Sequence, residues 1–148
     1  MDTVRFWTLI DLIDREALDA GDEDEAIAPL SDALTELTER EIESFQEHLS
    51  QVLYDIDGED YARESEDSGD SDDGFLYCRC YVVARGRQHY LSVKDNPEAM
   101  PKSVDQWCES LLYAAPKAWA EKTSNEPEDW EFSPSVSYET GSNTDLWP

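Results

Sequence analysis

The sequence predicts a mainly α-helical protein: a single compact domain of about five or six helices over residues 1–122, with an acidic loop at 55–73 and an irregular acidic tail at 123–148. Three observations support this fold class. Apolar residues recur at spacings of three and four along most of the chain, which is typical of amphipathic helices. No segment before residue 128, apart from the ambiguous run 75–85, looks like a strand. A chain of 148 residues with 39% hydrophobic residues can bury one core.

The first predicted helix covers residues 3–20. Asp2 or Thr3 is its N-cap, and Gly21 follows it as a C-terminal stop. Its apolar stripe has spacings of four, three and four, and consists of Phe6, Ile10, Ile13 and Ala17.

The second predicted helix begins with the acidic run 22–25, because carboxylates at a helix N-terminus suit the helix dipole. We expect Pro29 in the first turn and no deeper, since proline lacks the N–H that later turns require. Its apolar stripe is Ile27, Leu30, Leu34 and Leu37.

The third predicted helix has the clearest signature. Thr38 is followed three residues later by Glu41, which is a capping box. Behind it the apolar positions are spaced three, four, three and four: Ile42, Phe45, Leu49, Val52 and Ile56. Residues 55–73 then hold ten acids and one base, and indicate a mobile acidic linker or a poorly packed helical turn.

Residues 75–85 are aromatic and β-branched, which favours a strand, but their spacing also allows a buried helix. A strand here would have no partner, so we predict a helix with Ser71 as N-cap and Gly86 as stop. A short helix follows at 89–94. A further helix begins after Ser103, buries Trp107, Leu111, Leu112 and Ala115, and is kinked or ended by Pro116.

The net charge of −25 is unevenly distributed. Residues 1–54 carry −12, residues 55–73 carry −9, residues 74–122 carry +2 and residues 123–148 carry −6. This acidity excludes a general nucleic-acid binder, which needs a basic face. It also argues against docking to an anionic membrane.

Several short motifs resemble a known family. Residues 5–11, RFWTLID, resemble an "FW-x-L-I-D/E" opening, and residues 71–86, SDDGFLYCRCYVVARG, resemble the signature "SDDGF-x-YFR-x-WLI-x-x-G". Residues 95–98 and 111–115 are similar to a "DP-x-x-L" step and an "ELLY-x-A" helix. These motifs belong to the bacterial family catalogued as domain of unknown function 4240. The resemblance spans residues 4–122 and implies a mostly helical domain. It carries no established activity, and Cys78 and Tyr81 depart from the Phe and Trp of the signature.

Catalytic and metal-binding patterns are scarce. There is no glycine-rich phosphate loop, nucleophile elbow or zinc-protease motif, so we expect no catalytic residue and no cofactor. Residues 55–66 fail as an EF-hand because the required glycine is absent, and we expect no metal site. Cys78, Cys80 and Cys108 cannot close a disulfide framework, and no signal peptide or apolar span is present, so a cytoplasmic protein is expected.

The leading functional hypothesis is a protein–protein interaction protein that binds a basic surface. An immunity-type inhibitor of a cationic toxin, or a nucleic-acid mimic, would be a specific form of it. We expect the partner to touch the acids of the two runs: Asp22, Glu23, Asp24, Glu25, Asp55, Asp57, Glu59, Asp60, Asp70, Asp72 and Asp73.

Two other functional readings stay open. One is a small enzyme or ligand-binding domain with a pocket around Trp7, Asp73, Tyr77 and Arg79. Arg79 itself more readily forms a structural salt bridge with Asp11 or Asp14, because a buried guanidinium needs a partner. The other reading is that the acidity is an adaptation to a salty environment.

Overall fold

The computed structural model describes residues 1–148 and is mainly α-helical, as the sequence predicts. It contains eight α-helices, more than the five or six expected, together with four short 3₁₀-helices and no strand. The α-helices are α1 (Thr3–Ile10), α2 (Arg15–Asp19), α3 (Glu23–Thr35), α4 (Glu39–Asp55), α5 (Glu59–Glu64), α6 (Asp72–Ala84), α7 (Arg87–Asp95) and α8 (Ala114–Thr123). The 3₁₀-helices are η1 (Glu66–Asp70), η2 (Pro97–Ala99), η3 (Glu109–Tyr113) and η4 (Pro127–Asp129).

The predicted first helix is two helices. Asp2 caps α1 by accepting a hydrogen bond from the backbone N–H of Arg5. Asp14 then starts α2, because its carboxylate accepts from the N–H groups of Glu16 and Ala17. The apolar spacing continues across the break, so spacing alone could not reveal it. Gly21 follows α2 with a φ of +83°, as expected of a glycine that ends a helix.

Helix α3 begins at the acidic run, with Asp22 as N-cap and the next three acids in its first turn. The prediction for Pro29 was wrong, because this residue lies inside the helix rather than in its first turn. Its ring removes one backbone hydrogen bond from the helix. The carbonyl that loses its donor is that of Glu25, and Glu25 is exposed, so water can satisfy it.

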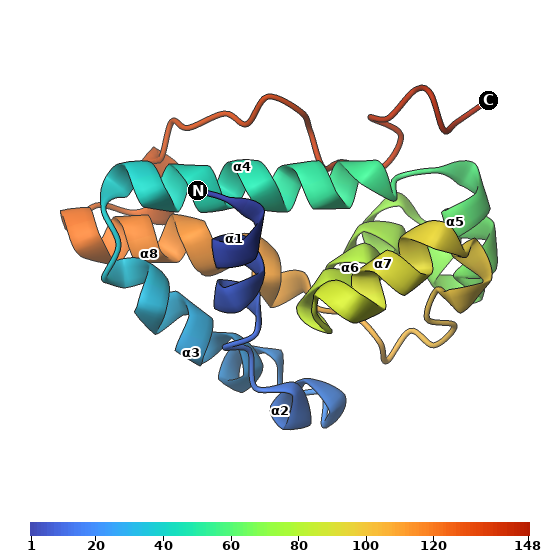
Figure 1. Ribbon diagram of the computed structural model, residues 1–148, viewed down its shortest axis with the longest axis horizontal. Helices are drawn as coiled ribbons and strands as arrows, with labels where there is room; N and C mark the ends of the chain where they lie inside the picture. Colours follow the sequence, from blue (N-terminus) through green and yellow to red (C-terminus); the bar gives the residue numbers. More distant parts are fainter.

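Helix α4 is the longest helix and packs against α8, α6 and α1 (Figure 1). Its capping box is confirmed: Thr38 accepts from the N–H of Glu41, and Glu41 accepts from the N–H of Thr38. The bond from the backbone N–H of Thr38 to the carboxylate lowers the pKa of Glu41. The apolar stripe of α4 is buried in the core, except Val52, which is half-buried.

Residues 55–73 are not a mobile linker. They form the end of α4, then α5, η1 and the first turn of α6. Gly69 explains the close packing of η1 on α5, because a Cβ on this residue would lie 1.9 Å from the carbonyl oxygen of Ala62. Ser65 and Ser68, which belong to this segment, are fully buried. The acidic run is therefore an ordered part of the domain.

The prediction of a helix for the ambiguous segment is confirmed by α6, and Ser71 caps it through a bond from the N–H of Gly74. Nearly the whole circumference of α6 is buried, which is why its residues lack a polar face. Gly86 ends it with a φ of +105°, and α7 follows directly, somewhat longer than the predicted 89–94.

The last predicted helix begins later than expected. Ser103 does not cap a helix but forms a turn, in which its hydroxyl accepts from the N–H of Asp105. The chain then forms η3 and enters α8 only at Ala114. Pro116 lies in the first turn of α8 rather than kinking or ending a helix, a position where proline is well tolerated.

One hydrophobic core of 34 buried residues contains side chains from all eight α-helices. Phe6, Phe45 and Phe75 are fully buried within it. No helix has both the length and the apolar character required to cross a membrane.

Candidate functional site

The acidic segment 55–73 does not present its carboxylates uniformly to solvent. Asp57 is fully buried. Its carboxylate accepts from the backbone N–H groups of Gly141 and Asn143, at 3.0 Å each, and from Nε1 of Trp147 at 2.9 Å. Asp57, which was expected to contact a partner, is therefore covered by the tail.

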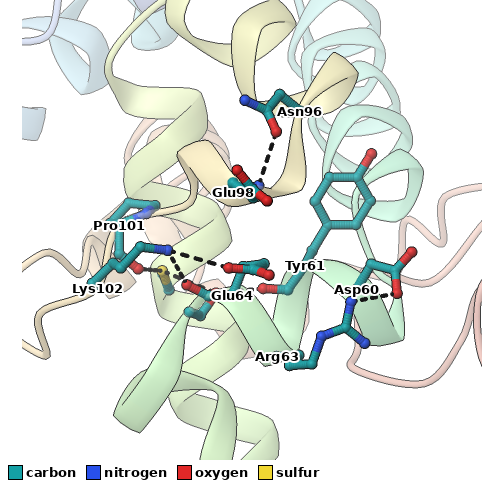
Figure 2. Close-up of polar contacts among 10 residues, drawn as sticks. Asp60, Tyr61, Arg63, Glu64, Asn96, Glu98, Pro101 and Lys102 are labelled. Atoms are coloured by element: carbon teal, nitrogen blue, oxygen red, sulfur yellow. Dashed lines mark hydrogen bonds and ion pairs between the residues drawn. The ribbon is translucent and has the colours of Figure 1, made fainter.

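Other acids of this segment are paired with nearby cations (Figure 2). Asp60 accepts from Arg63 at 2.9 Å, and Lys102 lies 3.6 Å from the carboxylate of Glu64 and donates to its backbone carbonyl. Asp55 lies 3.6 Å from Nζ of Lys94. These surface pairs are individually weak, but they reduce the negative charge offered by α5.

Four of the acids that remain unpaired line one groove of about 470 Å³. Glu59, Glu66, Asp67 and Asp70 line it, and none of them takes part in an ion pair. Trp147, from the other end of the chain, forms part of its wall. We call these five residues, together with the other lining residues Ala62, Arg63 and Gly69, the acidic groove. Sequence reasoning named Glu59 and Asp70 at a partner surface, included Glu66 and Asp67 only as part of the run 55–73, and did not place Trp147 there.

Asp72 and Asp73 follow the acidic groove in the chain and are exposed in the first turn of α6. Their position at the helix N-terminus gives them a structural role through the helix dipole. They also extend the exposed acidic surface beyond Asp70.

The run Asp22 to Glu25 lies apart from the acidic groove and lines different hollows. Glu23 and Asp24 accept from the backbone N–H and the hydroxyl of Ser110, at 3.1 and 3.0 Å. A hydrogen bond to Asp22, together with the charge of that neighbour, raises the pKa of Glu25. This run therefore caps α3 and ties it to the segment before α8.

The structure does not assemble the pocket predicted around Trp7, Asp73, Tyr77 and Arg79. Trp7 is buried against Phe6 and Tyr90, with a ring distance of 5.2 Å to Tyr90. Tyr77 packs edge-on against Trp107, whereas Asp73 is exposed. None of the five described hollows is lined by any of the four predicted residues.

Arg79 is fully buried but forms no salt bridge, so the predicted pairing with Asp11 or Asp14 was wrong. Asp11 instead pairs with Arg15, and Asp14 caps α2. The guanidinium donates to the carbonyl oxygen of Leu53 at 2.9 Å and to Oγ1 of Thr140 at 3.1 Å. It also lies 4.7 Å from the ring centre of Phe75.

The surroundings of Arg79 explain how a buried cation persists without a carboxylate in contact. Burial lowers the pKa of Arg79, and the charge of Asp57 acts against that shift. Leu53 is in the last turn of α4, where the helix dipole favours a cation. The neighbouring carbonyls are also capped: the hydroxyl of Tyr90 donates to Val52 at 2.7 Å, and Nδ2 of Asn143 donates to Tyr54 at 2.9 Å.

The sequence predicts that the tail lies on the surface, pinned by Trp130, Phe132 or Trp147, and both Trp130 and Trp147 pack against the core. The path of the tail along the domain was not predicted. Its residues alternate between exposed and half-buried over 131–140, so every second side chain faces the domain. The sequence carries this signal as apolar residues at alternate positions, Trp130, Phe132, Pro134, Val136 and Tyr138. Because the tail forms no strand, the pattern records packing against a helical surface.

The side chains that could bind a metal ion or react as thiols are dispersed or buried. No cluster of three or more His, Cys, Asp or Glu side chains is placed to hold a metal ion. The three cysteines are free and buried. Burial raises the pKa of Cys78 to about 11 and that of Cys108 to about 12, so both are thiols at neutral pH.

Comparisons with known proteins bear on the family. No curated protein and no solved structure gives a significant match. The model of one family, described as protein of unknown function (DUF4240), matches residues 1–121. That range contains both the opening RFWTLID and the signature in α6, and it ends within α8 before the tail begins. The chain therefore belongs to the DUF4240 family.

Proposed function

We propose that this protein is an interaction protein that binds a basic segment of a partner protein in the acidic groove. The observation that carries the proposal is the gathering of four unpaired carboxylates, from Glu59, Glu66, Asp67 and Asp70, around one hollow. Only one cation, Arg63, lines the same hollow, and it is held by Asp60.

The chemistry of the groove fits a lysine or arginine side chain. Exposed carboxylates accelerate the encounter with a basic surface and select against acidic partners. Their effect extends about 8 Å at physiological ionic strength, so carboxylates around one hollow act together. The indole of Trp147 adds a surface on which a cation can stack.

The same proposal takes two narrower forms. An immunity-type inhibitor would use the groove to cover a cationic toxin or nuclease, and a nucleic-acid mimic would space carboxylates as phosphates are spaced. The continuation of exposed acids from the groove to Asp72 and Asp73 supports an extended basic partner. We also propose a cytoplasmic location, as the sequence predicts.

A matched pair of variants tests the proposal with a fluorescently labelled hexalysine peptide. The groove variant combines Glu66→Gln, Asp67→Asn and Asp70→Asn. The control variant combines Asp32→Asn, Glu36→Gln and Glu121→Gln, which removes the same charge from exposed residues outside the groove. We expect the groove variant to weaken binding by about tenfold and the control by less than about twofold.

The salt dependence supplies a second measurement. Binding to the unaltered chain should weaken steeply between low and physiological salt, and the groove variant should show a shallower dependence. Equal loss in the groove and control variants would show that hexalysine responds only to net charge, and would overturn the proposal.

A further inference from the structure

The C-terminal tail lies against the domain as an extended segment. After α8 it returns alongside α4 and ends near α5 (Figure 1). Ser135 contacts the middle of α4, Asn143 contacts its C-terminal end, and Trp147 contacts Asp57 just beyond it. The tail thus occupies a continuous strip of the domain surface, which we call the tail groove.

The first anchor of the tail is a carboxylate of the domain. Glu47 accepts from the backbone N–H of Ser135 at 2.7 Å and from its hydroxyl at 2.6 Å. Nε2 of Gln51 donates to both Ser135 and Glu47, at 2.9 Å each. The tail contributes only the backbone N–H and the hydroxyl of Ser135 here, which many polypeptide segments could supply.

The second anchor consists of two fully buried charged groups of the domain. Every hydrogen bond to the carboxylate of Asp57 is donated by the tail. Arg79 donates to the tail through Thr140, whose hydroxyl in turn donates to the carbonyl of Asp72 at 2.7 Å. Without an occupant both charges would lose partners that the domain itself does not provide.

The tail satisfies this site incompletely. Nε of Arg79 is buried and has no hydrogen-bond partner, which carries a free-energy penalty. The tail carries six acids and no base, yet it lies on a domain that is itself strongly acidic. Glu139 and Asp145 are exposed on the tail close to its anchors. Like charges repel, so the acids of the tail oppose its docking on the acidic domain, although the charge of Glu139 also favours the buried guanidinium of Arg79.

We propose that the tail groove is a binding site for an extended polypeptide segment, which the tail occupies until a basic segment of a partner displaces it. The partner segment presents hydroxyl, backbone and amide donors in the order of Ser135, Thr140, Gly141 and Asn143, with basic residues at the outward positions of Glu139 and Asp145. This inference rests on the proposed function for the basic character of the partner.

Release of the tail would also alter the acidic groove. Trp147 donates a hydrogen bond to Asp57 and also lines that groove. Displacement therefore removes the indole and leaves the carboxylates of Glu59, Glu66, Asp67 and Asp70 in place. A partner that displaces the tail therefore still meets these carboxylates, but it must do without the stacking surface of Trp147.

The test adds three synthetic peptides, each covering residues 133–148, to the full-length chain labelled with ¹⁵N. The first has the natural sequence. The second carries Glu139→Lys and Asp145→Lys. The third carries these two changes and Asn143→Ala, which keeps the charge of the second but removes one anchoring amide. The amides of Gly141 and Asn143 and the indole of Trp147 in the chain report release of the tail.

We expect the second peptide to bind about tenfold more tightly than the first and to shift the three reporter signals toward a released state. The third peptide should bind about tenfold more weakly than the second, because it leaves the carbonyl of Tyr54 without its donor. Introducing Asn143→Ala into the chain itself should strengthen binding of the second peptide, since it weakens the competing tail.

Three results would overturn the proposal: equal binding of the first two peptides, equal binding of the last two, or binding that leaves the reporter signals unchanged. If the Asn143→Ala chain fails to fold, the peptide comparison on the unaltered chain still decides. Loss of hexalysine binding alone would reject only the acidic groove. Failure of the peptides to depend on Asn143, with hexalysine binding intact, would reject only the displaceable tail.

Discussion

At the scale of single residues, Asp57 and Arg79 show that charge in this protein has two distinct uses. Most acids are exposed, but Asp57 is buried and receives three hydrogen bonds from the tail. Arg79 is buried and held mainly by the carbonyl at the end of α4. Both are part of the architecture of the domain, because a buried charge is tolerated only where hydrogen bonds replace water.

Replacing Asp57 by asparagine should strongly destabilise the protein. The amide offers one oxygen in place of a carboxylate, and its own N–H₂ faces groups that also donate. Hydrogen bonds to a charged group are each worth about 1.5–3 kcal/mol, so we expect the free energy of unfolding to fall by about 3–5 kcal/mol. Urea unfolding followed by circular dichroism measures it.

Asp60→Asn is the matched control for that experiment. Asp60 is three residues away, exposed, and paired only with Arg63. Its replacement should change the free energy of unfolding by less than about 1 kcal/mol. Similar losses in the two variants would show that Asp57 contributes only its charge, and not its position beneath the tail.

At the scale of elements, the sequence predicted helices well where the signal was local. The capping box at Thr38 fixes the start of α4 because both of its bonds lie within four residues. The assignment of α6 succeeded because a strand there would have had no partner. Pro29 and Pro116 were misplaced because a proline does not by itself mark where a helix begins. Helix α3 begins after its N-cap Asp22, and α8 begins at the end of η3.

The candidate site was harder to predict than the helices. The partners of Asp57 are 84 to 90 residues away in the chain, so nothing near Asp57 distinguishes it from its exposed neighbours. Trp147 reaches the acidic groove for the same reason. The alternation of the tail was visible in the sequence, but it does not say which surface the tail would cover.

The docking of the tail should depend on pH through Glu47. Hydrogen bonds from the side chain of Ser135 and from Gln51 lower the pKa of Glu47 below its ordinary value of 4.5. A carboxyl whose pKa is lowered on folding contributes stability above its unfolded pKa, and that contribution is lost as the pH falls through the folded value. We therefore expect the tail near Ser135 to loosen only below about pH 4.5.

Amide exchange of Ser135, followed by NMR between pH 3 and 6, measures this loosening after correction for the intrinsic pH dependence. Protection should be constant above pH 5 and should decrease toward pH 3. Glu47→Gln provides the control, since it has no carboxyl to titrate and should remove the step. A step of the same size in that variant would assign the effect to another acid.

At the scale of the whole molecule, the net charge of −25 acts on folding as well as on binding. Folding brings the acidic tail next to the acids of α4 and next to the acidic segment 55–73. Bringing them together raises the electrostatic free energy of the folded state relative to the extended chain. The basic block 74–122 offsets part of this cost, because three of the six ion pairs join one of its cations to an acid elsewhere in the chain.

Salt should consequently stabilise the protein. Two effects oppose each other: screening weakens the six ion pairs, each worth at most about 1 kcal/mol when exposed, and it also weakens repulsion among a large excess of acids. The excess is much larger than the number of pairs, so repulsion dominates. Raising NaCl from 20 to 500 mM should increase Tm by roughly 5 °C.

The variant that combines Asp32→Asn, Glu36→Gln and Glu121→Gln is the control: it should have a higher Tm at low salt and should gain less when salt is added. A Tm that is unchanged or falls with salt would mean that the ion pairs balance or outweigh the repulsion, so that the acidic surface does not reduce the stability of the fold.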